Sequence, residues 1–387
     1  MKILYVISRP LEINTSASVR NRATILGLLE NGHTVDLFTT EPDKNHNAYD
    51  AKMSLGDSVA TTYIKLGGAQ SVARVGRRFR FLAPLRRLAY RFMKKYEVYD
   101  NLKGIANHVG VVSLAKGCYD LIISSSDPKS SHLFVLKLLE KQGADFHGRW
   151  IQIWGDPFIG DITLSAKSKQ GVIRKEEHRL LSGADKVVYV SELTRNAQQK
   201  NYPDCADKMY CYPIPYMEEC ITENRDLREV DRVNLVYCGD YNSKVRNILP
   251  LYEAVKNMKN AHLTICGGSD MNLESCDNIT VYPRVPYQTV VKLERSADIL
   301  VHLSNLHGSQ IPGKIYQYSG TNKPILFILD GDKEAHKAVF EPHSRYSFAD
   351  NTALDISAVI YKIKNENNEY LPLTVFSKGS ISQKIID

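Results

Sequence analysis

The sequence predicts an α/β fold built from two consecutive doubly wound domains. Short apolar runs alternate with helical stretches along almost the whole chain, which is typical of parallel sheets covered by helices. The chain has 387 residues, too long for one ordinary domain and comfortable for two. A cluster of proline and turn residues at 202–215 (YPDCADKMYCYPIP) interrupts the alternation near its middle and marks a domain boundary.

The first half opens with a strand, a helix and a second strand. Lys2–Ser8 is an apolar run, apolar residues recur at helical spacing over Val19–Glu30, Gly32 ends that helix, and Thr34–Thr39 is the next strand. This βαβ opening predicts a parallel sheet with helices on both faces. The later elements predicted here are strand Leu121–Ser124, helix Ser130–Lys141, strand Trp150–Trp154, helix Val172–Leu181 and strand Lys186–Val190.

A second alternating series follows the acidic and polar stretch at 218–231. Its predicted elements are strand Asn234–Cys238, helix Asn247–Met258, strand His262–Cys266, strand Ile279–Tyr282, helix Tyr287–Arg295, strand Asp298–Leu303, helix Gly313–Ser319 and strand Pro324–Leu329. Two α/β units of similar size predict a ligand site at the carboxyl ends of their strands.

Composition narrows the class of protein. Hydrophobic residues make up 43% and charged residues 24%, as in a packed globular chain. No apolar run approaches the roughly 18–20 residues that span a bilayer, and the apolar stretch at the N-terminus is too short for a secretory signal. The seven cysteines are scattered without a CxxC, which predicts neither disulfides nor a zinc site. We therefore expect a cytoplasmic protein.

The net charge of +7 is concentrated in one segment. Residues 74–95 (RVGRRFRFLAPLRRLAYRFMKK) hold seven arginines and two lysines, no acidic residue and several interleaved apolar residues. This composition favours a basic amphipathic segment on an anionic membrane surface, although a solvated helix face would have the same composition. No nucleic-acid-binding module accompanies the charge. The arginines expected to face the membrane are Arg77, Arg78, Arg80, Arg86, Arg87 and Arg91.

Six segments together resemble one enzyme family. They are MKILYVIS…VRNRATILGLLENGHTVDLFT, GADKVVYVSELTRN, YCYPIPY, LVYCGDYNSKVRNILPLYEAV, ADILVHLSNLHGSQIPGKIYQYSGTNKPIL and FSKGSISQKIID. They resemble the GT-B glycosyltransferases, most closely retaining enzymes of family 4 that build bacterial surface polysaccharides. The resemblance implies two Rossmann-like domains facing each other across a cleft. Residues 1–217 would bind the acceptor, residues 230–372 the nucleotide sugar, and residues 373–387 would form a helix crossing back to the first domain.

One departure from the family concerns the donor loop. The family usually carries two glutamates eight residues apart, and Ser309 and Gln317 stand at those positions here. Gln317 can still hydrogen-bond a ribose hydroxyl, although without charge assistance. The resemblance then implies a variant donor site, with a catalytically inactive binding subunit as the alternative.

The implied reaction moves a sugar from a nucleoside-diphosphate donor to a glycan or lipid-linked acceptor. In a retaining front-face mechanism the departing phosphate accepts the acceptor's proton, so no paired carboxylates are needed. A GT-B sugar-nucleotide 2-epimerase is a further alternative, although it would have no use for the basic segment. We expect the transferase to be peripheral on the inner face of the plasma membrane, with no nucleic-acid partner.

The leaving diphosphate calls for fixed positive charge, which can replace a metal ion. Lys244 and Arg246 lie in the loop after the first strand of the second domain, and Gly313-Lys314 opens a short helix. The loop with Lys244 and Arg246 and the segment at Gly313-Lys314 could also be ordinary surface turns. The Asp330-Gly331-Asp332 sequence favours a turn over a metal site. We expect no metal or cofactor. The predicted donor-binding residues are Gly239, Gly267, Gly268, Ser309, Ile311, Pro312, Gly313, Lys314 and Gln317.

Polar loops after strands of the first domain supply the acceptor candidates. The segments SSSDPKSSH and IQIWGDPF each follow a predicted strand, and the second resembles an RDPW-like segment that borders the cleft in the family. Asp156 is thus the predicted catalytic residue of this domain, beside Lys244 and Arg246 of the second. Loop capping or helix solvation would be the structural alternative for each. The predicted acceptor-binding residues are Thr15, Arg20, Arg22, Asp127 and His132.

Overall fold

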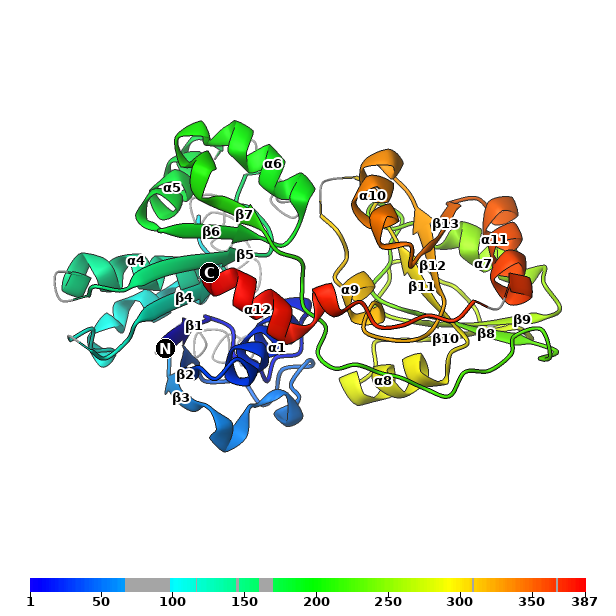
Figure 1. Cartoon of the computed structure of the whole chain (residues 1–387), viewed down its shortest axis with the longest axis horizontal. Coiled ribbons are helices and arrows are strands. Elements are labelled where there is room, and N and C mark those ends of the chain that lie inside the picture. The colour runs from blue at the N-terminus through cyan, green and yellow to red at the C-terminus, as the bar shows by residue number, and fades with distance from the viewer. Residues whose placement is uncertain (67–97, 116, 144–145, 160–169, 308–309, 367) are drawn as a thin grey trace, which may run out of the picture. The chain divides into compact units, whose positions relative to one another are not determined.

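The computed structural model describes residues 1–66, 98–115, 117–143, 146–159, 170–307, 310–366 and 368–387. They form two compact units, whose elements are labelled in Figure 1. Unit 1 consists of Met1–Tyr212 together with Ser382–Asp387, and unit 2 consists of Pro213–Ile381. The arginines predicted to face the membrane, between 77 and 91, and the predicted donor residue Ser309 lie outside the described residues.

Unit 1 is built on a seven-stranded sheet with the order β3-β2-β1-β4-β5-β6-β7, in which all neighbouring strands are parallel. The strands are β1 (Lys2–Val6), β2 (Thr34–Thr40), β3 (Ala60–Ile64), β4 (Leu121–Ser125), β5 (Arg149–Trp154), β6 (Lys186–Tyr189) and β7 (Met209–Cys211). Parallel sheets are covered on both faces, which is why β1, β4 and β5 are nearly continuous apolar runs.

Helices connect these strands. They are α1 (Ser16–Glu30), α4 (Ser130–Gln142), α5 (Gln170–Gly183) and α6 (Glu192–Asn201), with 3-10 turns η1 (Ala51–Met53), η2 (Gly56–Ser58), η4 (Lys103–Asn107), η5 (Val109–Val111) and η8 (Pro203–Lys208). Both tryptophans of the chain, Trp150 and Trp154, are almost fully buried in the core of this unit. Tryptophan fluorescence therefore reports on unit 1 alone.

Unit 2 repeats the same topology with a six-stranded sheet in the order β10-β9-β8-β11-β12-β13. The strands are β8 (Val233–Cys238), β9 (Ala261–Cys266), β10 (Ile279–Tyr282), β11 (Ile299–Leu303), β12 (Ile325–Leu329) and β13 (Ser347–Asp350). The helices are α7 (Leu249–Lys256), α8 (Tyr287–Ser296), α9 (Lys314–Tyr318), α10 (Lys333–Phe340) and α11 (Ala353–Glu366), with 3-10 turns η9 (Glu341–His343) and η10 (Thr374–Phe376). Its strands are all parallel.

The last helix, α12 (Lys378–Ile386), ends within unit 1. The Arg149 guanidinium donates to the carbonyl of Ile386, and Nζ of Lys186 donates to the carbonyl of Lys384 at 3.0 Å. The last carbonyls of a helix have no partner within it, and cations at that end also interact favourably with the helix dipole. These two side chains therefore fix the end of the chain on unit 1.

Shortening a buried side chain of α12 tests this attachment. Ile386 is 2% exposed, so Ile386→Val is expected to lower the free energy of unfolding of unit 1 by about 1 kcal/mol. Urea denaturation followed by tryptophan fluorescence measures this loss. Val172→Ala changes a residue that is 59% exposed and should stay within about 0.5 kcal/mol of the parent. Equal effects of the two substitutions would contradict a buried position for Ile386.

The elements predicted from apolar periodicity are confirmed, with ends that differ by at most three residues. The strands that the sequence did not predict are β3, β7 and β13, which have three to five residues each. All three lie at an outer edge of their sheets, where polar residues are tolerated and the apolar signal is weak. The helices α6, α10 and α11 were also not predicted.

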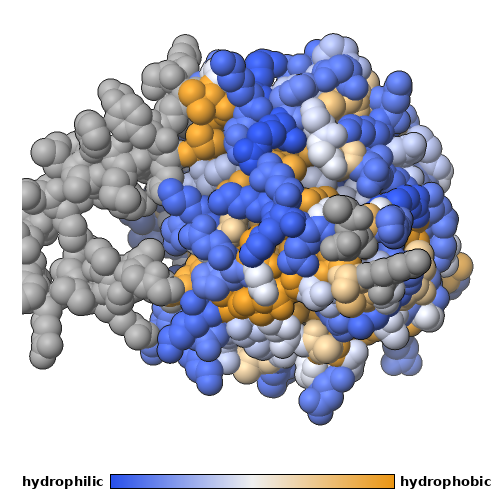
Figure 2. All heavy atoms as spheres, turned by 90° about the vertical axis from the view of Figure 1, so that its left-hand side faces the viewer, coloured by the Kyte–Doolittle hydropathy of each residue, from blue (hydrophilic) through white to orange (hydrophobic). Residues whose placement is uncertain are grey.

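One face of the described part of the molecule is mostly polar. On the face shown in Figure 2, hydrophilic residues dominate and apolar atoms come to the surface mainly near its centre. Within the part of the chain that the structure describes, no helix combines the length and the apolar character that crossing a membrane requires.

Candidate functional site

The two sheets have the same switch point. In each unit the first strand lies between the second and the fourth, so β1 and β4 are neighbours in unit 1, and β8 and β11 in unit 2. The connections on either side of such a pair leave in opposite directions. Ligands of open α/β sheets bind there, beyond the carboxyl ends of the strands. The loops after these four strands are therefore the first place to look for a site.

In unit 2 an arginine joins the loops on both sides of the switch point. Arg246 donates from Nη1 to the carbonyl of Asp240 (2.7 Å), in the loop after β8. Its Nε and Nη2 donate to Oδ1 of Asn305 (3.1 and 2.8 Å), in the loop after β11. Asn305 is 4% exposed and donates in turn to the carbonyl of Gln310 (3.0 Å), so the guanidinium rests on a buried support.

The turn that carries Arg246 is closed by its own backbone. Asn242 and Arg246 exchange two backbone hydrogen bonds (3.1 and 3.0 Å), and the Asn242 side chain accepts from the backbone N–H of Lys244 (3.0 Å). The turn exposes Lys244 and holds Arg246 against the sheet edge. The two predicted cations thus lie on one turn.

Two glycines let the loops after β8 and β9 meet. A Cβ on Gly267 would lie 2.0 Å from the carbonyl oxygen of Gly239, so only glycine fits at 267. Asp240 accepts from the backbone N–H of Gly268 (2.8 Å) and pairs with the Arg284 guanidinium. The predicted donor residues Gly239, Gly267 and Gly268 are therefore in mutual contact around Asp240.

Lys314 forms an ion pair with a carboxylate of unit 2. Its Nζ lies 2.5 Å from Oε1 of Glu294 on α8. Burial lowers the pKa of Lys314, but the Glu294 carboxylate and other nearby groups raise it by more, so its pKa lies above the ordinary value. α9 is only five residues long, so its N-terminus offers a weaker dipole than the sequence suggested. Arg246 is thus the better-placed cation of the two.

Gln317, predicted to bind the donor, contacts the backbone at 215–217 through its side-chain amide. Its Nε2 donates to the carbonyl of Pro215 (2.9 Å), and its Oε1 accepts from the backbone N–H of Met217 (3.0 Å). Both ends of the amide are thus used to hold the chain at 215–217. Ile311 is buried, and Pro312 and Gly313 precede α9 at partly exposed positions.

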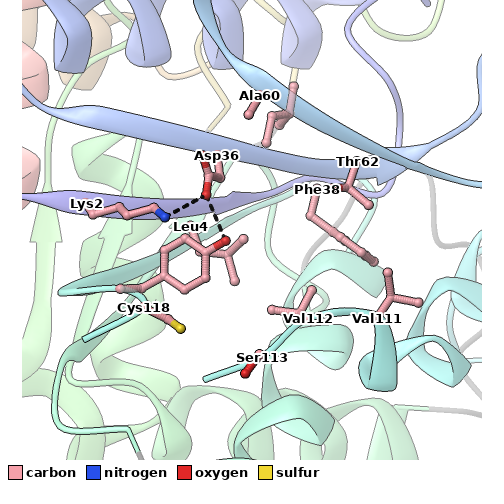
Figure 3. A pocket seen from close by; sticks show the side chains of 12 residues that line it. Lys2, Leu4, Asp36, Phe38, Ala60, Thr62, Val111, Val112, Ser113 and Cys118 are labelled. Carbon is pink, nitrogen blue, oxygen red and sulfur yellow. Dashed lines mark hydrogen bonds and ion pairs between the residues drawn. The ribbon is translucent and has the colours of Figure 1, made fainter. Parts of the chain in front are cut away.

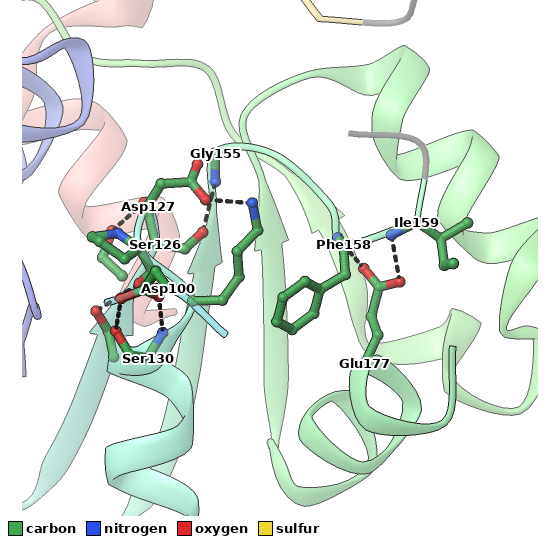
Figure 4. Close-up of polar contacts among 12 residues, drawn as sticks. Asp100, Ser126, Asp127, Ser130, Gly155, Phe158, Ile159 and Glu177 are labelled. Atoms are coloured by element: carbon green, nitrogen blue, oxygen red, sulfur yellow. Dashed lines mark hydrogen bonds and ion pairs between the residues drawn. The ribbon is translucent and has the colours of Figure 1, made fainter. Parts of the chain in front are cut away.

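In unit 1 a buried arginine and two carboxylates meet at the switch point (Figure 4 shows the loop around Asp127). Arg20, 4% exposed on α1, donates to the carbonyl of Ser126 and to Oγ of Ser125 (3.3 Å). Burial lowers the pKa of Arg20, whereas the nearby carboxylates of Asp127 and Asp156 raise it. The predicted residues Asp127 and Asp156 therefore each interact electrostatically with Arg20.

Lys129 adds a second cation to this cluster. Its Nζ lies 2.5 Å from Oδ1 of Asp127 and 5.7 Å from the ring centroid of Phe158. The backbone N–H of Gly155 donates to Oγ of Ser126 (3.2 Å), which joins the loop after β4 to the loop after β5. The cluster holds two cations and two carboxylates, so its charge is balanced.

A buried glutamate holds the loop that carries Asp156. Glu177 on α5 is not exposed, and its carboxylate accepts from the backbone N–H groups of Phe158 (2.7 Å) and Ile159 (3.0 Å). The Tyr202 hydroxyl donates to the same carboxylate (2.7 Å). Burial raises the pKa of Glu177, and these donors partly offset the effect. Asp156 itself is partly exposed.

The other acceptor candidates occupy structural positions. Thr15 caps α1 by accepting from the backbone N–H of Ser18 (3.2 Å). His132 is fully buried, stacks on Trp154 at 4.4 Å between ring centroids, and pairs through Nδ1 with Oγ of Ser124 (2.8 Å). This geometry therefore disfavours direct contact between His132 and an acceptor. Arg22 is partly exposed on α1.

Buried histidines predict a loss of stability in acid. Burial holds the pKa values of His132 and His302 well below the ordinary value and lowers that of His336. The unfolded chain binds their protons near pH 6.5, so the free energy of unfolding falls as pH drops below about 6.5, by about 1.4 kcal/mol per pH unit for each histidine. Above that pH their contribution is constant. Urea denaturation between about pH 5 and 7.5 measures how steeply the free energy of unfolding depends on pH. His132→Gln should make this dependence less steep for unit 1. An unchanged dependence would contradict a buried, neutral His132.

Asp330-Gly331-Asp332 forms a turn, the conformation favoured by the sequence. Gly331 has a φ of +61°, Asp332 accepts from the backbone N–H of Ala335 (3.3 Å) at the start of α10, and Asp330 accepts from Nδ2 of Asn351 (2.7 Å). Both carboxylates thus hold the chain.

A cavity of about 230 Å³ lies elsewhere in unit 1, beside Lys2 at the start of β1 (Figure 3). Its polar side is formed by Asp36, which accepts from the Tyr119 hydroxyl (2.9 Å) and lies 3.5 Å from Nζ of Lys2. Because it opens beside the amino end of β1, we place neither substrate there.

Several residues of these clusters were not predicted. Three of them, Lys129, Asn305 and Glu294, contact candidate residues, and Glu177 holds the loop that carries Asp156. Glu177 left a signal, because Ile173, Glu177 and Leu180 lie on the same face of α5 and a carboxylate at such a position is unusual. Asn305 and Glu294 have no local signal, since their partners are distant in the sequence. Lys129 lies only two residues from its partner Asp127, within the SSSDPKSSH loop.

Comparison with known proteins adds structural relatives only. No protein-family profile matches the chain, and no curated protein matches it either. HepE of Anabaena, in complex with UDP and glucose, has a TM-score of 0.57 at 12% identity, over 100% of this chain and 94% of that chain. The lipopolysaccharide outer core galactosyltransferase WaaB has a TM-score of 0.51 at 12% identity, over 100% and 96%. A UDP-N-acetylglucosamine 2-epimerase has a TM-score of 0.53 at 10% identity, over 100% and 94%.

At such low identity the likeness establishes the fold. It extends over the whole chain, and the two parallel sheets with their repeated strand order agree with it. The chain therefore has the predicted GT-B architecture of two Rossmann-like α/β units.

Proposed function

We propose that the chain is a glycosyltransferase that moves a sugar from a nucleoside-diphosphate donor to a glycan or lipid-linked acceptor. Unit 2 binds the donor and unit 1 the acceptor, by a retaining mechanism that needs no metal. Support comes from the GT-B fold, from a relative in complex with UDP and glucose and from another that is a lipopolysaccharide galactosyltransferase. The second of these also supports a place in surface-polysaccharide synthesis.

The observation that carries the proposal is the position of Arg246. The described contacts use three of its N–H groups, one each on Nε, Nη1 and Nη2. A guanidinium has five N–H donors, and the Tyr237 hydroxyl also interacts with this one, so at least one N–H group remains for the oxygens of a diphosphate. The charge that develops on a leaving diphosphate is the main demand of the reaction, and an arginine already held in place meets it without reorganisation.

The remaining candidates have roles around this centre. Lys244 adds a mobile point charge from the exposed turn, and the backbone around Gly267 lets the nucleotide approach. In unit 1, Asp156 contacts the acceptor hydroxyl or the reacting sugar, with Asp127 beside it. The departing phosphate takes the acceptor's proton. Addition of Mg²⁺ or Mn²⁺ to chelator-treated enzyme should therefore leave the rate unchanged.

A panel of nucleotide sugars tests the proposal. The purified chain is incubated with each donor, and its thermal stability and the slow release of nucleoside diphosphate are measured. One donor is expected to raise the melting temperature and to be hydrolysed. Binding without release would favour a non-catalytic subunit. If neither donors nor free diphosphates bind, the site assignment is wrong and only the fold remains.

A 2-epimerase is the second candidate, because one structural relative is a UDP-N-acetylglucosamine 2-epimerase. The products separate the two activities. Conversion of a UDP-N-acetylhexosamine to its C2 epimer without an acceptor would establish the epimerase. Release of nucleoside diphosphate that increases with added acceptor would establish the transferase.

We also propose that the chain works at the cytoplasmic face of an anionic membrane, supported by the seven arginines and two lysines of residues 74–95. It should float with vesicles containing phosphatidylglycerol and not with phosphatidylcholine alone. The double substitution Arg86→Glu and Arg87→Glu should abolish this binding, whereas Arg195→Glu should not. Flotation that does not depend on the charge of the lipids would contradict the proposal.

A further inference from the structure

A histidine, an aspartate and a cysteine meet at the surface of unit 1. His178 lies on α5, and Asp204 and Cys205 lie on η8. Nε2 of His178 is 2.6 Å from Oδ2 of Asp204, and Sγ of Cys205 is 3.9 Å from the same carboxylate oxygen. All three atoms lie within 4.8 Å of one another. We propose that these residues bind a divalent cation of the zinc type.

The chemistry of the three groups fits such an ion. Imidazole nitrogen, thiolate sulfur and carboxylate oxygen are the ligands of zinc, at about 2.0–2.3 Å, which places neighbouring ligand atoms of a tetrahedral site about 3.3–3.6 Å apart. The observed separations of 2.6 and 3.9 Å lie on either side of this range, so small side-chain rotations suffice. Harder ions that prefer oxygen ligands, such as Mg²⁺, are disfavoured by the sulfur and nitrogen ligands.

Access and coordination number also fit. The side chains of His178 and Asp204 are 45% and 60% exposed, so an ion can enter from solvent and water can complete its coordination. Cys205 is 3% exposed and closes the inner side of the site. The Asp204 carboxylate has a lowered pKa, chiefly because of its hydrogen bond with His178, and is ionised at neutral pH.

The elements that carry the ligands are held together by other residues. Nζ of Lys208, the last residue of η8, donates to the carbonyl of Ser182 near the end of α5 (3.0 Å) and to that of Ala184 just after the helix (2.8 Å). Nε2 of Gln199 donates to the carbonyl of Ala206 in η8 (3.2 Å). The backbone geometry of the site therefore exists before the ion binds, which lowers the cost of binding.

The ion would brace the loop that carries Asp156. Tyr202, the residue before η8, donates to the carboxylate of Glu177, which neighbours His178 and holds the backbone of Phe158. An ion joining α5 to η8 thus stabilises the contact on which that loop depends. Its role is structural, and the inference does not depend on the transferase activity.

Proton balance gives the site a pH dependence. On binding, the thiol proton of Cys205 passes to solvent as the thiolate–metal bond forms, and any proton on the ligating nitrogen of His178 is released too. No electron is transferred. Affinity is therefore expected to fall as the solution becomes more acidic.

Cobalt titration tests the site. The full chain, freed of any histidine tag and of metal, is titrated with Co²⁺ and its absorption recorded. A thiolate-to-cobalt charge-transfer band and visible bands of a four- or five-coordinate ion are expected, and Zn²⁺ should remove both. His178→Gln and Asp204→Asn should each weaken Co²⁺ binding at least about tenfold, and Cys205→Ser should abolish the charge-transfer band.

The matched control is Cys276→Ser, which removes an exposed cysteine of unit 2 and should leave every band and the affinity unchanged. If the Cys205→Ser variant does not fold, the His178→Gln and Asp204→Asn variants at the exposed positions still test the site. No charge-transfer band, a band lost with Cys276→Ser, or unchanged affinity in the His178 and Asp204 variants would overturn the site and leave a simple His–Asp surface pair. None of these results bears on donor binding by unit 2.

Discussion

Replacement of Arg246 by alanine is expected to weaken donor binding roughly 10- to 150-fold, since hydrogen bonds to charged groups contribute about 1.5–3 kcal/mol. The guanidinium is fixed by Asp240 and Asn305 from two loops, so it meets the diphosphate without losing side-chain freedom on binding. The value of kcat/KM should fall at least as much as affinity, because the charge on the diphosphate grows in the transition state. Isothermal titration with the donor or its nucleoside diphosphate measures the first effect, and release of diphosphate the second.

Two further variants separate charge from geometry. Arg246→Lys keeps the charge but cannot reach both loops in a planar fork, so it should recover only part of the loss. Arg228→Ala removes another arginine of unit 2, one that pairs with Asp226 at 2.6 Å on the surface, and should bind donor normally. Wild-type affinity in Arg246→Ala, or an equal loss in Arg228→Ala, would show that Arg246 does not contact the diphosphate.

Replacement of Arg20 by methionine is expected to lower the free energy of unfolding of unit 1 by about 3–5 kcal/mol, the usual cost of breaking a buried ion pair. The substitution leaves the carbonyl of Ser126 without its donor and removes the positive charge beside the carboxylates of Asp127 and Asp156. Urea denaturation followed by tryptophan fluorescence reads this loss in unit 1 without a signal from unit 2, because both tryptophans lie in unit 1.

The control is the same substitution at a partly exposed arginine. Arg195 pairs with Glu192 on the surface of unit 1 at 2.7 Å, and Arg195→Met should change stability by less than about 0.5 kcal/mol. Arg20→Lys should be intermediate, because one ammonium group replaces the planar fork. A loss in Arg20→Met no larger than in Arg195→Met would mean that the buried guanidinium is not the support of this loop cluster.

Much of the candidate site in unit 2 could be predicted because it follows strands directly. Gly239 comes after β8, Gly267 and Gly268 after β9, and Arg246 lies one short turn further on. Once the sheet order is Rossmann-like, these loops must share an edge. The predicted role of Gln317 rested instead on the position of a family motif, and the structure uses that amide to hold the backbone at 215–217.

The sequence by itself determined the fold class, the succession of elements and the loops that carry polar residues, because apolar periodicity and turn residues act over a few neighbouring positions. Which side chains meet was decided only by the tertiary structure. Arg20 and Ser126 are 106 residues apart, Arg246 and Asn305 are 59 apart, and His178 and Asp204 are 26 apart. Contacts across such separations form when distant strands pair and helices pack on them, and no local pattern encodes them.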